Sequence, residues 1–138
     1  MVIWKKILIG AASTIALVVA CAVGLFLYFA SGMCGNFIHK EYISPDKQLK
    51  AVVFQRDCGA TTRFSTQISI IGADKDINNG GGNIYVIDGH PEKVAPNVSW
   101  SSNRKLNIHR PLNGSEYKAE SEWGWFKSVE LSYKSDNS

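Results

Sequence analysis

The chain begins with a long apolar run and then changes to an alternating pattern of apolar and polar residues. From Ile7 to Ala30 no residue carries a charge, and twelve of these twenty-four residues are Ile, Leu, Val or Phe. A helix of this length covers roughly 36 Å, whereas the hydrocarbon core of a bilayer is about 30 Å thick. The pattern predicts a transmembrane anchor helix spanning about residues 7–30, with residues 1–31 forming a cytoplasmic stub and the anchor.

The charges that flank the apolar run predict its orientation. Lys5 and Lys6 precede the run, and the first charged residue after it is Lys40. Because lysine and arginine stay on the cytoplasmic side, we expect a single-pass protein of the cell (inner) membrane with a cytoplasmic N-terminus. The C-terminal domain is then extracytoplasmic.

Two other fates of this segment are open. Ala30, Ser31 and Gly32 are small residues that suit cleavage of a signal peptide, although the apolar run is longer than the usual 7 to 15 residues. The stretch 18–21 loosely resembles a lipoprotein signal ending at Cys21, but apolar residues follow it where a polar tether is expected. We therefore expect the segment to remain as an uncleaved anchor.

Small residues recur every fourth position of the predicted helix, at Ala12, Ala16, Ala20 and Gly24. This spacing places them on one face, where a second helix can approach closely and form a homodimer. The alternative is that alanine is simply common in membrane helices.

Alternation with a period of two predicts β-strands after the anchor. Residues on one face of the clearest strand are Phe64, Thr66, Ile68 and Ile70, and those on a C-terminal strand are Trp125, Val129, Leu131 and Tyr133. Shorter runs at 83–88, 98–100 and 105–109 also have the composition of β-strands. The glycine-rich stretch 78–83 predicts an exposed loop. For residues 117–122 a short helical turn is one possibility, and the structure of this stretch is left open. The expected fold is mainly β: residues 32–134 form one small antiparallel β-sandwich-like domain of about seven strands, and residues 135–138 form a disordered tail.

A turn in this domain leads to a prediction about the cysteines. Ser44, Pro45 and Asp46 suit a hairpin turn, in which Lys47 would take the left-handed position usually given to glycine. Residues that face each other across a hairpin centred on Asp46 have numbers that sum to about 92, as Cys34 and Cys58 do. Facing residues lie about 4.5 to 5.5 Å apart at Cα, within the reach of a disulfide. We therefore predict a Cys34–Cys58 bond, with Cys21 unpaired in the bilayer.

A block of residues around Cys58 resembles a known family. The block consists of residues 55–62, Gln-Arg-Asp-Cys-Gly-Ala-Thr-Thr, followed by Phe-Ser-Thr-Gln-Ile-Ser-Ile at residues 64–70. Together with residues 33–36, 44–46 and 88–91, it resembles the pattern of a family of small, uncharacterised bacterial membrane-anchored proteins, a domain of unknown function. The family pattern has glycine in the turn where this chain has Lys47. The resemblance implies a bacterial, membrane-anchored setting and no particular activity.

The charge of the outer domain is nearly balanced. Lys5 and Lys6 belong to the anchor segment. The rest of the chain contains the other thirteen of the fifteen basic residues and all twelve acidic residues. A nucleic-acid-binding protein gathers its basic residues on one surface, and here they are scattered. We therefore expect no nucleic-acid partner.

Four polar residues near the predicted disulfide form the best candidate site: Arg56, Asp57, Thr61 and Thr62. A guanidinium beside two hydroxyls can bind a carboxylate, a phosphate or a glycan. In the competing structural interpretation, Arg56 and Asp57 form an ion pair at the end of a strand and the threonines stabilise a turn. Trp123, Trp125 and Phe126 are a second candidate, as an exposed ligand platform or as part of the core.

Catalytic and metal-binding patterns are weak in this sequence. His39, His90 and His109 are far apart along the chain, Asp88 and His90 are separated by a turn glycine, and no serine lies in a nucleophile elbow. We expect no catalytic residue, metal or cofactor, and a non-enzymatic binding or structural module of the bacterial envelope. Its expected partners are membrane lipid, through the anchor, and an envelope protein or the cell wall. A hydrolase or transferase acting on envelope polymers, and an inhibitor or immunity-type protein, are the alternatives.

Overall fold

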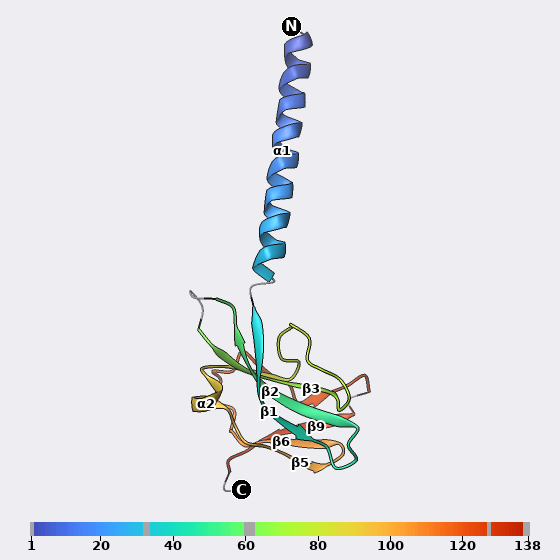
Figure 1. Cartoon of the computed structure of the whole chain (residues 1–138), viewed down its shortest axis with the longest axis vertical. Coiled ribbons are helices and arrows are strands. Elements are labelled where there is room, and N and C mark those ends of the chain that lie inside the picture. The colour runs from blue at the N-terminus through green and yellow to red at the C-terminus, as the bar shows by residue number, and fades with distance from the viewer. Residues whose placement is uncertain (1, 32–33, 60–62, 127, 137–138) are drawn as a thin grey trace. The chain divides into compact units, whose positions relative to one another are not determined.

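The computed structural model in Figure 1 describes residues 2–31, 34–59, 63–126 and 128–136, and it divides the chain into two units, Met1–Cys34 and Gly35–Ser138. The first unit is helix α1 (Val2–Ser31), which is long and apolar enough to cross a membrane. The helix begins before Lys5 and Lys6, so the residues expected to form a separate stub are its first turns. Thirty helical residues extend about 45 Å.

The face of α1 that carries the small residues is exposed in this single chain. Ala12, Ala16, Ala20 and Gly24 are all exposed, as is the free thiol of Cys21. The hydroxyl of Thr14 donates to the carbonyl oxygen of Gly10 at 2.9 Å, so this polar group is satisfied within the helix. Self-association through the small-residue face remains a prediction.

The second unit is mainly β and contains two sheets (Figure 1). Sheet A has the strand order β1-β2-β3-β4-β7, and all of its neighbouring strands are antiparallel. Its strands are β1 (Gly35–Ile43), β2 (Leu49–Asp57), β3 (Ser65–Gly72), β4 (Tyr85–Asp88) and β7 (Lys118–Ala119). Sheet B has the order β5-β6-β9-β8, and its strands are β5 (Val98–Ser102), β6 (Lys105–Ile108), β8 (Glu122–Trp123) and β9 (Val129–Tyr133). The strands β6 and β9 run parallel, and the short helix α2 (Pro91–Val94) joins β4 to β5.

One core lies between the two sheets. Sheet A contributes alternate residues of its three central strands, and sheet B contributes residues of β5, β6 and β9. The fully buried members include Val53, Ile68, Tyr85, Leu106 and Val129. The expected sandwich-like domain of β-strands is confirmed.

The other face of sheet A is also buried, which the alternating pattern did not predict. Val52 and Phe54 point away from the shared core, yet their exposed fractions are 0% and 1%. The segment 73–83 crosses this face, and its backbone is held there because Gly82 N donates to the side-chain oxygen of Gln67 at 2.6 Å. The glycine-rich stretch is a loop, as expected, and it covers the sheet.

The structure settles one stretch that the sequence left open and corrects one prediction. The residues around 117–122, for which a helical turn was one possibility, form parts of strands β7 and β8. Trp125 does not belong to the last strand, because Gly124 adopts a positive φ of 102° and the chain turns before β9 begins at Val129. The structure describes Ser135 and Asp136 of the expected disordered tail, whereas 137–138 lie outside the described residues.

The predicted disulfide between Cys34 and Cys58 is present, although its register arises differently from the prediction. Lys40 to Ile43 pair with Val53 to Lys50, so facing numbers near the turn sum to 93. A bulge between Ile38 and Lys40 then shifts the register, and Gly35 pairs with Asp57 at a sum of 92. Without the extra residue of the bulge, Cys34 would have faced Gly59.

The turn that closes this hairpin is built from side-chain and backbone hydrogen bonds. Lys47 N donates to the carbonyl of Ser44 at 2.9 Å, and the Ser44 hydroxyl donates to the Asp46 carboxylate at 2.7 Å. The hydrogen bond from Ser44, followed by the one from the Gln48 amide, lowers the pKa of Asp46. Lys47 has a φ of 61°, which confirms the predicted left-handed position.

We predict that Lys47→Gly stabilises the protein. The Lys47 side chain is exposed, and the left-handed conformation is unfavourable for a residue with a Cβ. The free energy of unfolding should rise by roughly 0.5 to 1 kcal/mol, after allowance for the greater flexibility of unfolded glycine. Urea unfolding of the full chain in detergent micelles measures this, with Lys75→Gly as an exposed control; a destabilised Lys47→Gly variant would contradict the prediction.

Candidate functional site

The Arg56 side chain, which the sequence singled out as a ligand-binding candidate, holds the loop that covers sheet A. Its Nη1 atom donates to Asn36 Oδ1 at 2.8 Å and to the carbonyl oxygens of Asn79 and Gly80, each at 3.1 Å. Asn36 Nδ2 donates to the carbonyl oxygens of Asn78 and Gly80 at 3.0 and 2.7 Å. Arg56 and Asn36 thus act as a clamp on residues 78–80.

The rest of that predicted cluster is not brought into one site. Asp57 Oδ1 accepts from the backbone amide of Gly59 at 3.0 Å, which stabilises the bend after β2. Thr61 and Thr62 lie outside the described residues. For Arg56 and Asp57 the structural interpretation accounts for the contacts better, although the two do not form the expected ion pair with each other among the described contacts.

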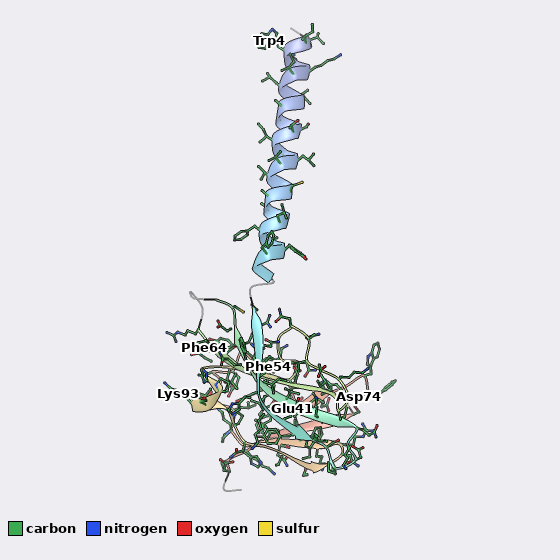
Figure 2. The ribbon with its side chains drawn as sticks, viewed as in Figure 1. Trp4, Glu41, Phe54, Phe64, Asp74 and Lys93 are labelled. Carbon is green, nitrogen blue, oxygen red and sulfur yellow. The ribbon has the colours of Figure 1, made fainter. Side chains whose placement is uncertain are left out.

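A different surface has the character of a binding site. It is an open hollow of about 430 Å³ at the start of β3 and around the turn after β4. We call it the anchor-proximal hollow; its lining residues are Arg63, Phe64, Asp88, Gly89, His90 and Lys93. Figure 2 shows Phe64 and Lys93 together on one flank of the β domain.

The register of sheet A places this hollow at the end of the sheet where β1 begins, which follows α1 in the chain. Gly35 pairs with Asp57, and in the next cross-strand row Arg56 pairs with Ser65, which in turn pairs with Asp88. Cys34 directly precedes the first of these residues, and the Cys34–Cys58 bond fixes the ends of β1 and β2 to each other. The hollow therefore lies at the same end of the sheet A strands as the start of β1, which follows α1 in the chain.

Packing and hydrogen bonds shape the hollow from within the domain. The rings of Phe64 and His90 meet edge to face, with centroids 5.4 Å apart. His90 Nδ1 accepts from the backbone amide of Glu92 at 3.2 Å, so a neutral His90 ring carries its proton on Nε2 and is a donor there. Gly89 has a φ of 114°, and a Cβ at this position would meet a methyl group of Val94 at 2.9 Å. Only glycine allows the turn to approach α2 so closely.

The hollow combines a cationic and an apolar surface. Arg63 forms an ion pair with Asp88 at 3.5 Å, but 88% of its side chain remains exposed. Lys93 is exposed on α2, and Phe64 keeps 43% of its surface in solvent. Such a surface can bind a ligand that joins an anionic group to an apolar portion. Sequence reasoning missed it because the residues come from two separate turns.

A second polar arrangement lies on sheet B. Ser99 Oγ and His109 Nε2 are 2.8 Å apart, and His109 Nδ1 lies 3.7 Å from an oxygen of Asp136. His109 Nδ1 is buried and has no hydrogen-bond partner within the described part of the chain. If the Ser99 hydroxyl donates to Nε2, the ring proton is on Nδ1 and faces the carboxylate, which is the order of contacts in a Ser-His-Asp triad.

Two tyrosines, the buried Tyr85 and the partly buried Tyr133, are part of the core rather than acid or base groups. The rings of Tyr85 and Tyr133 are 5.6 Å apart, and the Tyr133 hydroxyl donates to the carbonyl of Glu120 at 2.6 Å. Burial raises the pKa of both hydroxyls, and for Tyr133 the neighbouring Tyr85 adds to the effect. Both phenols are therefore neutral at physiological pH.

The predicted aromatic platform is divided between core and surface. Trp123 packs against the core, whereas Trp125 and Phe126 are 97% and 92% exposed at the tip of the β8–β9 turn. This tip lies toward the end of the domain that carries the β1–β2 turn, because Glu130 N donates to Arg104 O and Asn103 accepts from Asp46 in that turn. The three side chains do not form one surface.

Metal ligands are not grouped in the part of the chain that the structure describes: no three His, Cys, Asp or Glu side chains there could hold an ion together. Comparisons of the chain with protein-family models, with curated proteins and with solved structures found no match. The resemblance to a bacterial membrane-anchored family therefore remains a prediction.

Proposed function

We propose that the protein is a membrane-anchored binding module that presents its β domain on the extracytoplasmic side of a bacterial inner membrane. The apolar helix α1 supplies the anchor, and the disulfide suits an oxidising compartment. The lysines at the start of α1 favour a cytoplasmic N-terminus.

The observation that carries the proposal is the anchor-proximal hollow. Its exposed Arg63 and Lys93 side chains stand beside the Phe64 ring, and the Phe64–His90 contact and the Gly89 turn fix the shape around them. Groups that are already held in place in the free protein lose less conformational entropy when a ligand binds. Such a surface therefore suits a protein that binds a ligand without transforming it. Its ligand carries an anionic group.

A photo-crosslinking amino acid in place of Phe64 tests this in intact cells. We expect an adduct of one defined mass at position 64, reduced at least about fivefold by Arg63→Gln with Lys93→Gln, and no such adduct from a probe at the exposed Tyr117. The paired variant Arg104→Gln with Lys105→Gln removes the same charge elsewhere and should leave the yield unchanged. Absence of an adduct, or equal adducts at both positions, would contradict the proposal. One tightly held protein at position 64 would instead favour the inhibitor or immunity-type alternative for the same surface.

The contacts among Ser99, His109 and Asp136 favour a second candidate, a hydrolase acting on envelope polymers. In that case Ser99 Oγ attacks an ester or amide carbonyl while His109 Nε2 takes its proton. A fluorophosphonate probe should label the full chain, and Ser99→Ala or His109→Gln should abolish labelling while Ser101→Ala leaves it intact. If the wild-type chain is not labelled, the hydrolase is refuted. These residues then serve only to hold the C-terminal segment against sheet B.

A further inference from the structure

We infer that the ligand of the anchor-proximal hollow is the phosphate headgroup of an anionic phospholipid in the same membrane that holds α1. This inference rests on the proposed function and names the class of its ligand. The lipid-binding surface consists of the hollow and of Phe37, which lies near the same end of sheet A.

The length of the connection limits how far this surface can lie from the headgroups. The 45 Å that α1 extends, as estimated above, is about the 40 to 45 Å thickness of a bilayer with its headgroups. Only four residue steps separate Ser31 at the end of α1 from Gly35 at the start of β1, a span of at most about 14 Å. Three strand spacings of about 4.8 Å then separate β1 from β4 and the hollow. The hollow is thus tethered within roughly 30 Å of the headgroup layer, so lipid is present at a high effective concentration.

The apolar side chains at this end of the sheet suit the membrane interface. Phe37 and Phe64 are 59% and 43% exposed. Phe37 pairs across β2 with Thr66, two residues after Phe64, so both phenylalanines belong to the same face of sheet A. A Cβ built on Gly35 would touch the Phe37 ring at 3.4 Å, which places that ring beside the start of β1. Aromatic rings at the membrane–water interface can insert among the lipid headgroups and the upper parts of the acyl chains.

The charges of the hollow select an anionic headgroup. Arg63 and Lys93 are exposed cations that line the hollow together with Phe64 and His90, and Arg63 can bind a phosphate while it remains paired with Asp88. Basic residues close to a membrane surface bind acidic lipids. The electrostatic attraction between the two falls off within about one Debye length of the surface. Asp88 and the exposed Glu92 reduce this attraction, so we expect a preference for anionic lipid that is clear but moderate.

The test uses the full chain in lipid nanodiscs, with the photo-crosslinking residue at position 64 or at position 125. The two positions are matched because each replaces an exposed aromatic residue, and they lie toward opposite ends of the β domain. In discs that contain phosphatidylglycerol, we expect lipid adducts at position 64, at least about fivefold more than in discs of phosphatidylcholine alone. Arg63→Gln with Lys93→Gln should remove this difference, whereas Arg104→Gln with Lys105→Gln should preserve it.

Three results would overturn the inference. They are lipid adducts at position 125 that equal or exceed those at position 64, a yield at position 64 that does not depend on phosphatidylglycerol, and a yield that does not depend on Arg63 and Lys93. The cellular experiment separates this failure from failure of the proposed function. A charge-dependent adduct with a protein or a cell-wall fragment at position 64 refutes lipid as the ligand and leaves the binding module intact, whereas no adduct of any kind refutes both.

Discussion

Removing the Cys34–Cys58 bond should lower the free energy of unfolding of the β domain by about 3 kcal/mol. The bond closes a loop of about 25 residues, and the loss of loop-closure entropy from the unfolded chain gives this magnitude. For a domain whose total stability is roughly 5 to 15 kcal/mol, the loss is large. The double variant Cys34→Ala with Cys58→Ala is preferable to a single one, because it leaves no unpaired thiol. Urea unfolding of the full chain in micelles measures the loss, followed by tryptophan fluorescence, in which the partly buried Trp100 and Trp123 report on the core.

The chain contains its own control for this prediction. Cys21 is a free thiol on α1, so Cys21→Ala removes a cysteine and leaves the β domain unchanged. The midpoint of unfolding should fall for the double variant and for the reduced wild type by the same amount, and Cys21→Ala should behave as wild type. A double variant as stable as the oxidised wild type would show that the bond contributes nothing to the domain.

Replacing Arg56 with methionine should destabilise the domain by about 2 kcal/mol even when no ligand is present. Methionine keeps most of the side-chain volume and removes the Nη1 donor that binds Asn36, Asn79 and Gly80. Hydrogen bonds from a charged donor contribute roughly 1.5 to 3 kcal/mol, and the carbonyl oxygens that remain can return to water when the loop lifts. Loss of the clamp should also expose Phe54, which lies beneath the loop.

Hydrogen exchange shows whether the effect is local to the covering loop. In Arg56→Met, amide protection should fall in residues 73–84 and persist in β6 and β9. Arg63→Met is the matched control, because Arg63 is largely exposed and its loss should change stability by less than about 0.5 kcal/mol. If Arg56→Met unfolds like wild type, the clamp is not structural and a ligand-binding role for Arg56 becomes the better interpretation.

The features that follow from short-range pattern were predictable from the sequence. The uncharged run gives α1, the alternation from Phe64 to Ile70 gives β3, and the Ser44–Pro45 turn gives the first hairpin. The disulfide was predicted correctly because the turn lies half a residue beyond its assumed centre and the bulge near His39 compensates for that error. No signal in the sequence marks such a bulge.

The candidate site was harder to predict because its residues meet only in the folded chain. Arg56 looked like a ligand-binding residue, and its partners at 79 and 80 lie in a loop whose position depends on packing against Phe54. The hollow joins two turns that the pairing of β3 with β4 brings together. The Ser99–His109 contact could have been predicted, because a hairpin centred near Asn103 brings Ser99 on β5 close to His109, which directly follows β6. Asp136 comes from the far end of the chain, and no local pattern connects it to His109.

The membrane topology is tested most directly by protease treatment of spheroplasts from cells that produce the chain with an epitope after Ser138. We predict that protease added outside intact spheroplasts removes the epitope, while a cytoplasmic marker protein survives until the cells are lysed. An epitope that stays protected until lysis, in a chain that fractionates with the membrane or with the cytosol, would contradict an extracytoplasmic β domain.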